Sequence, residues 1–105
     1  MAFVEIAKAG DIPGGTMKSF DLEGNKILIT NYNGKYYAIA NRCTHAGGDL
    51  SKGKLEDKIV TCPRHGSKFD VTTGHCVSGP AKKDESTYQV KVEGIALKIS
   101  VSTSN

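Results

Sequence analysis

Two short stretches, CTHAGG at 43–48 and CPRHGSKF at 62–69, decide how this sequence is interpreted. Each contains one cysteine and one histidine with glycine close by, and the two pairs are Cys43 with His45 and Cys62 with His65. A lone cysteine is usually a small buried hydrophobic residue. Thiolate and imidazole groups repeated in two matched pairs are instead typical ligands for soft or borderline metal ions. The doubled pair therefore predicts a metal site shared between two loops.

Strand patterns surround these two stretches. The run NKILIT (25–30) is apolar and rich in β-branched residues, and a turn ending in Asn-Gly joins it to the run at 35–40, which indicates a β-hairpin. Residues 87–92 and 95–101 alternate between apolar and polar with the period of two that half-buried strands have. Shorter strands are expected at 3–6, 16–20, 58–62 and 68–71.

The chain is expected to be a single all-β domain over residues 1–105. Its length suits one domain, no long stretch has a helical period, and twelve glycines lie among short strands, as in a sandwich or barrel. The segment 42–81 is rich in Gly, Cys, His and Pro. We expect residues 1–41 and 82–105 to form a β base, with 42–81 inserted as a small subdomain that carries the site, because function concentrates in loops on a rigid scaffold.

Composition and charge favour a protein that binds neither nucleic acid nor a membrane. Fourteen basic and eleven acidic residues give a net charge of +3, without the clustered basic stripe of a nucleic-acid-binding protein. No apolar segment reaches the ~18 residues that span a bilayer, and residues 1–15 lack the pattern of a secretory signal. We therefore expect a cytoplasmic location, where reduced thiols favour metal binding over disulfides.

Five basic residues lie close in sequence to the Cys/His pairs. They are Lys52, Lys54, Lys58, Arg64 and Lys68. Two interpretations are open: an ordinary solvated face, or a rim on which an acidic partner docks.

The distribution of the ligands bears on the kind of metal. A usual zinc finger takes two cysteines from one pair and two histidines from the other, whereas each loop here supplies one of each. That arrangement suits two metal ions side by side, one bound by the two cysteines and the other by the two histidines. This is the ligand set of a Rieske [2Fe–2S] centre, in which two histidines replace two cysteines on one iron. A zinc-stabilised interaction module is the alternative.

The two Cys/His stretches resemble the cluster-binding boxes of Rieske-type ferredoxins, of the soluble kind that serves bacterial oxygenases rather than the respiratory kind. FDVTTG at 69–74 and GPA at 79–81 are also similar to that family. The resemblance implies an antiparallel β-sandwich with an inserted small cluster-binding subdomain, and one [2Fe–2S] cluster per chain. It assigns the two cysteines to one iron and the two histidines to the other, nearer the surface, so that the ligands are Cys43, Cys62, His45 and His65.

The neighbours of the ligands indicate which kind of Rieske protein the sequence resembles. Respiratory members join two extra cysteines as a disulfide, and Gly48 and Arg64 stand at those positions here. High-potential members hydrogen-bond the cluster through a serine and a tyrosine. Ser67 retains the serine, but Phe69 replaces the tyrosine and has no group to donate. The resemblance therefore implies a reduction potential in the low part of the Rieske range of about −150 to +300 mV.

Small residues and a third loop are expected around the cluster. Three glycines would let backbone N–H groups approach the sulfurs closely, although ordinary turn glycines are the alternative. These are Gly47, Gly48 and Gly66. By resemblance, Pro80 lies in a third loop that shields the cluster. His75 and Cys76 form an adjacent pair that the family does not use as ligands, and we expect an exposed imidazole and a buried thiol there.

The resemblance implies a one-electron carrier rather than an enzyme. A complete Rieske oxygenase would need a second iron site of two histidines and a carboxylate, and only His75 remains after the cluster ligands are used. A flavin reductase as electron donor and an oxygenase-type acceptor are implied by the resemblance alone. The alternatives are the zinc-stabilised interaction module and a Rieske-like small subunit of a reductase complex.

Overall fold

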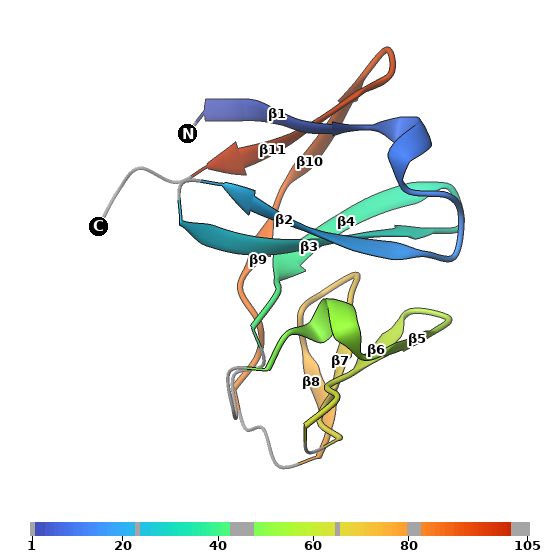
Figure 1. The fold of residues 1–105 in the computed structure, drawn as a ribbon, viewed down its shortest axis with the longest axis vertical. Helices are drawn as coiled ribbons and strands as arrows, with labels where there is room; N and C mark the ends of the chain where they lie inside the picture. The colour runs from blue at the N-terminus through green and yellow to red at the C-terminus, as the bar shows by residue number, and fades with distance from the viewer. Residues whose placement is uncertain (1, 23, 43–47, 65, 80–82, 102–105) are drawn as a thin grey trace.

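The computed structural model describes residues 2–22, 24–42, 48–64, 66–79 and 83–101, which contain three antiparallel sheets (Figure 1). The first sheet has the strand order β1 (Ala2–Lys8), β11 (Ala96–Val101), β10 (Val90–Glu93). The second has the order β2 (Met17–Leu22), β3 (Asn25–Tyr32), β4 (Lys35–Ala40), β9 (Thr87–Tyr88). The third has the order β5 (Lys54–Glu56), β6 (Ile59–Thr61), β7 (Lys68–Asp70), β8 (Cys76–Ser78). Two 3₁₀ turns, η1 (Ala9–Asp11) and η2 (Leu50–Lys52), are the helical elements of the described ranges. The prediction of an all-β antiparallel fold is confirmed.

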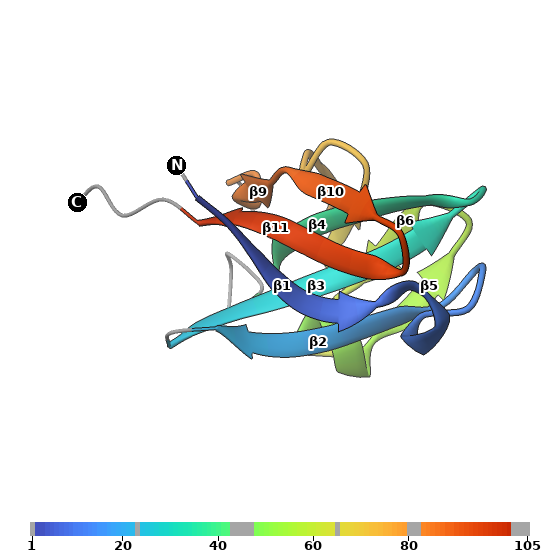
Figure 2. The same cartoon turned by 90° about the horizontal axis from the view of Figure 1, so that it is seen from above.

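The first two sheets pack against each other and form the base, which Figure 2 shows from above. Ile27 and Ile29 of β3 and Leu97 and Ile99 of β11 are buried in the apolar core between them. Because successive strand residues point to opposite faces, these alternate positions line the interior of the base. The base therefore combines residues from both ends of the chain.

The central strand β3 is buried on both of its faces. Leu28 points away from the interior of the base and packs with Ile39 of β4 in a second apolar core. The partners that the middle of the chain contributes to this core are Leu50, Val60, Cys62, Phe69 and Val71. Burial of both faces explains why β3 has a continuous apolar run instead of an alternating pattern. The third sheet thereby packs on the outer face of the base.

The predicted hairpin is confirmed, with a first strand that is two residues longer than expected and a second strand at the expected 35–40. β3 continues to Tyr32, which pairs with Lys35, so the connection is the two-residue turn Asn33-Gly34. Both turn residues have positive φ, 54° and 81°. This backbone matches a type I′ turn, whose twist fits the two strands and which favours the Asn-Gly dipeptide.

The prediction of one strand over 87–92 is wrong, because the chain changes sheets at Gln89. β9 pairs with β4, whereas β10 pairs with β11 of the other sheet. At the crossing, the Gln89 N–H donates to Ser100 Oγ at 3.0 Å, and the Gln89 carbonyl accepts from the Ser100 N–H at 2.9 Å. Side-chain alternation continues through the crossing, so the sequence pattern carries no sign of it. Ile95, expected in the following strand, lies in the turn before it and is exposed.

The third sheet is built from strands of three residues each. The predicted strands at 58–62 and 68–71 correspond to β6 and β7, whereas β5 and β8 were not expected from the sequence. Three residues are too few to show an alternating pattern. The subdomain boundaries at 42 and 81 stay a prediction. In the described ranges, no helix is long and apolar enough to cross a membrane.

Candidate metal centre

Of the four predicted ligands, Cys62 is the one that the structure describes. Cys43, His45 and His65 lie outside the described residues. So do Gly47 and Pro80. Within the part of the chain that is described, no three His, Cys, Asp or Glu side chains gather in a metal-binding group.

Cys62 lies at the base of a tightly closed loop between β6 and β7. Its N–H donates to the Ser67 carbonyl at 2.7 Å, and its carbonyl accepts from the Gly66 N–H at 3.2 Å. Gly66 has φ +80°, a conformation that glycine adopts without strain. The Cys62 side chain is 2% exposed and belongs to the core that contains Phe69. The loop thus holds one buried thiol at its base, while Arg64 is exposed.

The end of the first Cys/His stretch lies against this loop. A methyl group at Gly48 would be 3.3 Å from Cys62 Sγ and 3.1 Å from Cγ and Cδ of Arg64. Next to it, Arg42 and Asp49 form an isolated antiparallel bridge across the two ends of that stretch. Gly48 and Arg64, the positions of the missing disulfide, are therefore neighbours in space. The small glycine leaves room for the aliphatic part of Arg64.

A third segment also packs against this loop. Gly79 follows β8 with φ +96°, and a methyl group there would be 2.5 Å from Ser67 Cα and 3.0 Å from the Gly66 carbonyl oxygen. Only glycine combines this backbone conformation with so close an approach. Ser67 itself is completely buried. Segments from three parts of the chain thus meet around Cys62 and Ser67.

Asp84 contacts His75 and Cys76 through its carboxylate, and this interaction was not predicted from the sequence. Asp84 Oδ1 accepts from the Cys76 N–H at 2.8 Å, and Asp84 Oδ2 is 3.0 Å from His75 Nδ1. The hydrogen bonds from the Cys76 N–H and from His75 hold the pKa of Asp84 below its ordinary value. An isolated aspartate has no sequence signature that would have revealed this contact. His75 is exposed as expected, but Cys76 is half-buried instead of buried, because β8 is an edge strand.

The stability of the Asp84→Asn variant is expected to fall less at acidic pH than the stability of the wild type does. Since the pKa of Asp84 is lower in the folded protein than its ordinary value of 3.8, its stabilisation is complete above that value and is lost as the pH falls through the folded pKa. The wild-type thermal midpoint, followed by circular dichroism from pH 7 to pH 3, should exceed that of the variant most at neutral pH and converge with it in acid. The exposed Asp21→Asn variant is the control and should follow the wild type. A constant difference at all pH values would contradict this account.

Phe69 is completely buried in the core that it shares with Cys62, and it pairs with Val60 across the sheet. We expect Phe69→Tyr to raise the reduction potential, because a phenolic O–H near the centre can donate a hydrogen bond that stabilises the reduced, more negative state. A net hydrogen bond of about 0.5–1.5 kcal/mol corresponds to about 20–65 mV for one electron. Redox titration measures the shift, with Phe20→Tyr in the base core as the control. An unchanged or lower potential would count against the hydrogen bond.

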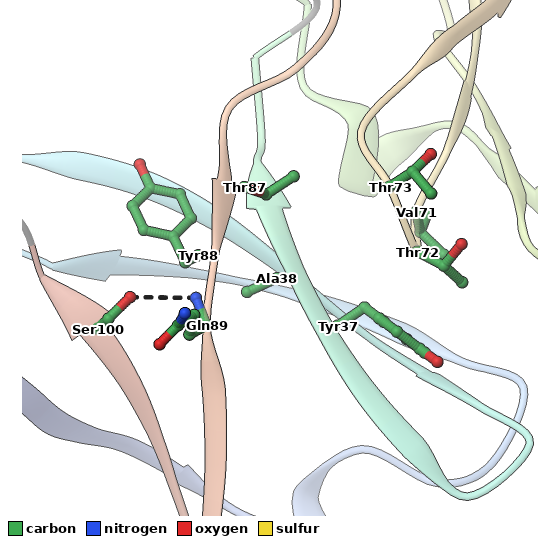
Figure 3. A pocket seen from close by; sticks show the side chains of 9 residues that line it. All are labelled: Tyr37, Ala38, Val71, Thr72, Thr73, Thr87, Tyr88, Gln89 and Ser100. Carbon is green, nitrogen blue, oxygen red and sulfur yellow. Dashed lines mark hydrogen bonds between the residues drawn. The ribbon is translucent and has the colours of Figure 1, made fainter.

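A pocket of about 410 Å³ lies elsewhere, where the base meets the turn after β7 (Figure 3). Hydroxyl-bearing side chains line it, among them Tyr37, Thr72 and Thr73. Neither Cys62 nor Gly48 belongs to its lining. The candidate metal centre around Cys62 is therefore separate from this pocket.

Comparison with known proteins identifies the family. The family model described as the Rieske [2Fe-2S] domain matches residues 2–96. The ferredoxin component of biphenyl 2,3-dioxygenase from Rhodococcus jostii (strain RHA1) is 39% identical over 94 residues, 90% of this chain and 88% of that protein. The ferredoxin component of the naphthalene 1,2-dioxygenase/salicylate 5-hydroxylase systems from Ralstonia sp. is 36% identical over 95 residues, 90% and 91% of the two chains. A solved structure titled a complex of reduced oxygenase and oxidized ferredoxin in carbazole 1,9a-dioxygenase matches with a TM-score of 0.87 and 26% identity, over 92% of this chain and 91% of that chain.

The match to the Rieske [2Fe-2S] domain and to two ferredoxin components identifies an iron–sulfur electron-transfer protein. The chain belongs to the Rieske [2Fe–2S] family. It carries one [2Fe–2S] cluster and acts as an electron carrier, not as an enzyme, which confirms the predicted function and cofactor. The zinc-stabilised module is thereby set aside.

The described residues fit this cofactor. Cys62, whose backbone is fixed by two hydrogen bonds, would hold the cluster through its thiolate, and the glycines at 48 and 79 keep side chains out of the space beside its loop. When bound, the cluster takes up and releases one electron at a time.

Proposed function

We propose that the chain passes single electrons from a flavin reductase to an oxygenase, with Cys43 and Cys62 on one iron and His45 and His65 on the other. The observation that carries the ligand assignment is Cys62, which is buried at the base of the closed loop with Gly48 beside its sulfur. The second stretch therefore has the rigid backbone that a cluster ligand needs. A cytoplasmic location is part of the proposal, since reducing conditions keep the cysteines available to iron.

The choice of partners rests on the relatives. Two of them are ferredoxin components of dioxygenase systems, and the solved relative is a ferredoxin in complex with its oxygenase. This chain spans 88–91% of the length of these three chains. A protein of this size that holds a one-electron centre suits a shuttle between a two-electron flavin enzyme and an oxygenase.

The test uses the purified holoprotein. It should be reduced by an NADH-dependent flavin reductase of a dioxygenase system and then reoxidised by the terminal oxygenase of that system in stopped-flow experiments. Failure of both half-reactions, with the visible absorption of the cluster intact, would overturn the proposed partners. Co-elution with a reductase through gel filtration of the native extract would instead favour the small subunit of a reductase complex.

A further inference from the structure

The outer face of the third sheet carries its charges in two separate rows. The strand register places Lys54, Thr61 and Lys68 side by side across β5, β6 and β7. Two residues further along the strands, the same register aligns Glu56, Ile59 and Asp70. The residues between the rows, among them Val60 and Phe69, are buried against the base. Because strand side chains alternate between faces, both rows point outward.

The two rows lie at opposite ends of the sheet. Thr61 directly precedes Cys62 and Lys68 directly follows Ser67, so the basic row borders the loop of the candidate metal centre. The acidic row borders the turn between β5 and β6, which contains Asp57. In Figure 1 the loop between β6 and β7 lies at the lower tip of the molecule, away from the β5–β6 turn.

Ion pairs distinguish the basic residues near the two rows from one another. Lys58 lies 3.6 Å from Asp70 at the acidic end, and Lys52 lies 3.8 Å from Asp49, so both lysines are paired. Lys54, Lys68 and Arg64 are exposed, and none of them has an acidic side chain within ion-pair distance in the described ranges. Of the five basic residues near the Cys/His pairs, the three without an ion pair in the described ranges therefore lie beside the metal-centre loop.

We propose that Lys54, Lys68 and Arg64 form a basic docking rim that directs the metal-centre tip onto an acidic surface of a redox protein. The proposal rests on the proposed electron-carrier function and adds the chemistry of the partner surface. A cationic rim at one end and carboxylates at the other orient the molecule in the field of an acidic partner before contact. Of the five basic residues near the Cys/His pairs, these three belong to the rim, while Lys52 and Lys58 belong to local ion pairs.

The first experiment needs no protein partner. Reduced holoprotein is oxidised by the anion ferricyanide, which takes one electron to become ferrocyanide, or by the cation tris(phenanthroline)cobalt(III), which takes one electron to become the cobalt(II) complex. The rate with the anion should fall and the rate with the cation should rise as the ionic strength increases from about 0.01 M to about 1 M. In the Lys54→Gln/Lys68→Gln variant, the rate with ferricyanide at low ionic strength should fall about three- to tenfold.

The control variant Lys8→Gln/Lys35→Gln removes the same charge from the base. It should retain the wild-type rates. The reduction potential of each protein is measured alongside, and the rates are compared after correction for differences in driving force, so that the remaining change in rate reports the electrostatic attraction of the rim. A second readout does not depend on electron transfer. The redox-inert anion hexacyanochromate(III) should broaden the backbone amide resonances of residues 54 and 68 in the wild type. This broadening should be absent at the same positions of the Lys54→Gln/Lys68→Gln variant.

The second experiment repeats the rate measurement with the oxygenase. A loss of rate in the rim variant that disappears at high salt supports the proposal. Equal rates for the rim and control variants, with either the anion or the oxygenase, overturn it while leaving the electron carrier intact. If the wild type itself exchanges no electrons with reductase or oxygenase, the proposed function fails, and the anion experiment still decides whether the rim exists.

Discussion

The Cys62→Ser variant is expected to fold without a cluster. Serine offers a hydroxyl that stays protonated at neutral pH and is a poor ligand for iron, whereas a thiolate is the ligand that iron–sulfur centres require. Cys62 is 2% exposed in an apolar core, so bulk water has little access to the position of the lost donor. The visible absorption and the bound iron should both fall to near zero, as measured by absorption spectroscopy and iron analysis.

The matched control is Cys76→Ser. Cys76 lies in the edge strand β8, is half-buried, and has its Sγ 3.8 Å from the Ser78 carbonyl. This variant should retain the full iron content. Circular dichroism of both variants separates loss of the cluster from loss of the fold. Full iron content in Cys62→Ser, or its loss in Cys76→Ser, would contradict the ligand assignment.

The Gly53→Ala variant is expected to be the most destabilising glycine replacement outside the loops of the metal centre. Gly53 connects η2 to β5, and a methyl group there would overlap the carbonyl oxygen of Thr61 and lie 3.2 Å from the Leu50 carbonyl oxygen. Both neighbours are backbone atoms, and Thr61 is held by its pairing with Lys54 and Lys68. Overpacking against a fixed backbone costs about 3 kcal/mol. For a domain of this size, the thermal midpoint should fall by more than about 10 °C.

Gly10→Ala is the control for this prediction. A methyl group at Gly10 meets no atom within 4 Å, and Gly10 does not have a positive φ. Its free energy of unfolding should stay within about 0.5 kcal/mol of the wild type, as is usual for surface changes. Thr61 directly precedes Cys62, so Gly53→Ala should also lower the iron content. Equal midpoints for the two alanine variants would show that the sheet accommodates the methyl group.

Much of the fold could be predicted from short-range patterns. The Asn33-Gly34 dipeptide and the alternating pattern at 95–101 define local conformation, and these parts of the prediction are confirmed. The change of sheet at Gln89 could not be predicted, since it depends on pairing with Ser100 and with β4, both distant in sequence. The three-residue strands β5 and β8 likewise form because a neighbouring strand is present, not because of their own composition.

The candidate site divides in the same way. The proposed ligands and their order come from two six- to eight-residue stretches, which is why the family and the cofactor could be inferred before any fold was known. The contact of Gly48 with Arg64, the packing of Gly79 on Ser67 and the Asp84 contact with His75 join segments that carry no mutual signal in the sequence.

By itself, the sequence determined the family, the cofactor and the tight turns, because the donor atoms of cysteine and histidine and the backbone preferences of turn residues do not depend on distant contacts. The tertiary structure alone decided which glycines have no room for a side chain, which lysines are neutralised by carboxylates, and where the remaining positive charges lie. The reason is that steric overlap and Coulomb interaction depend on distances between atoms, and the distances across the third sheet are set by strand pairing rather than by separation along the chain.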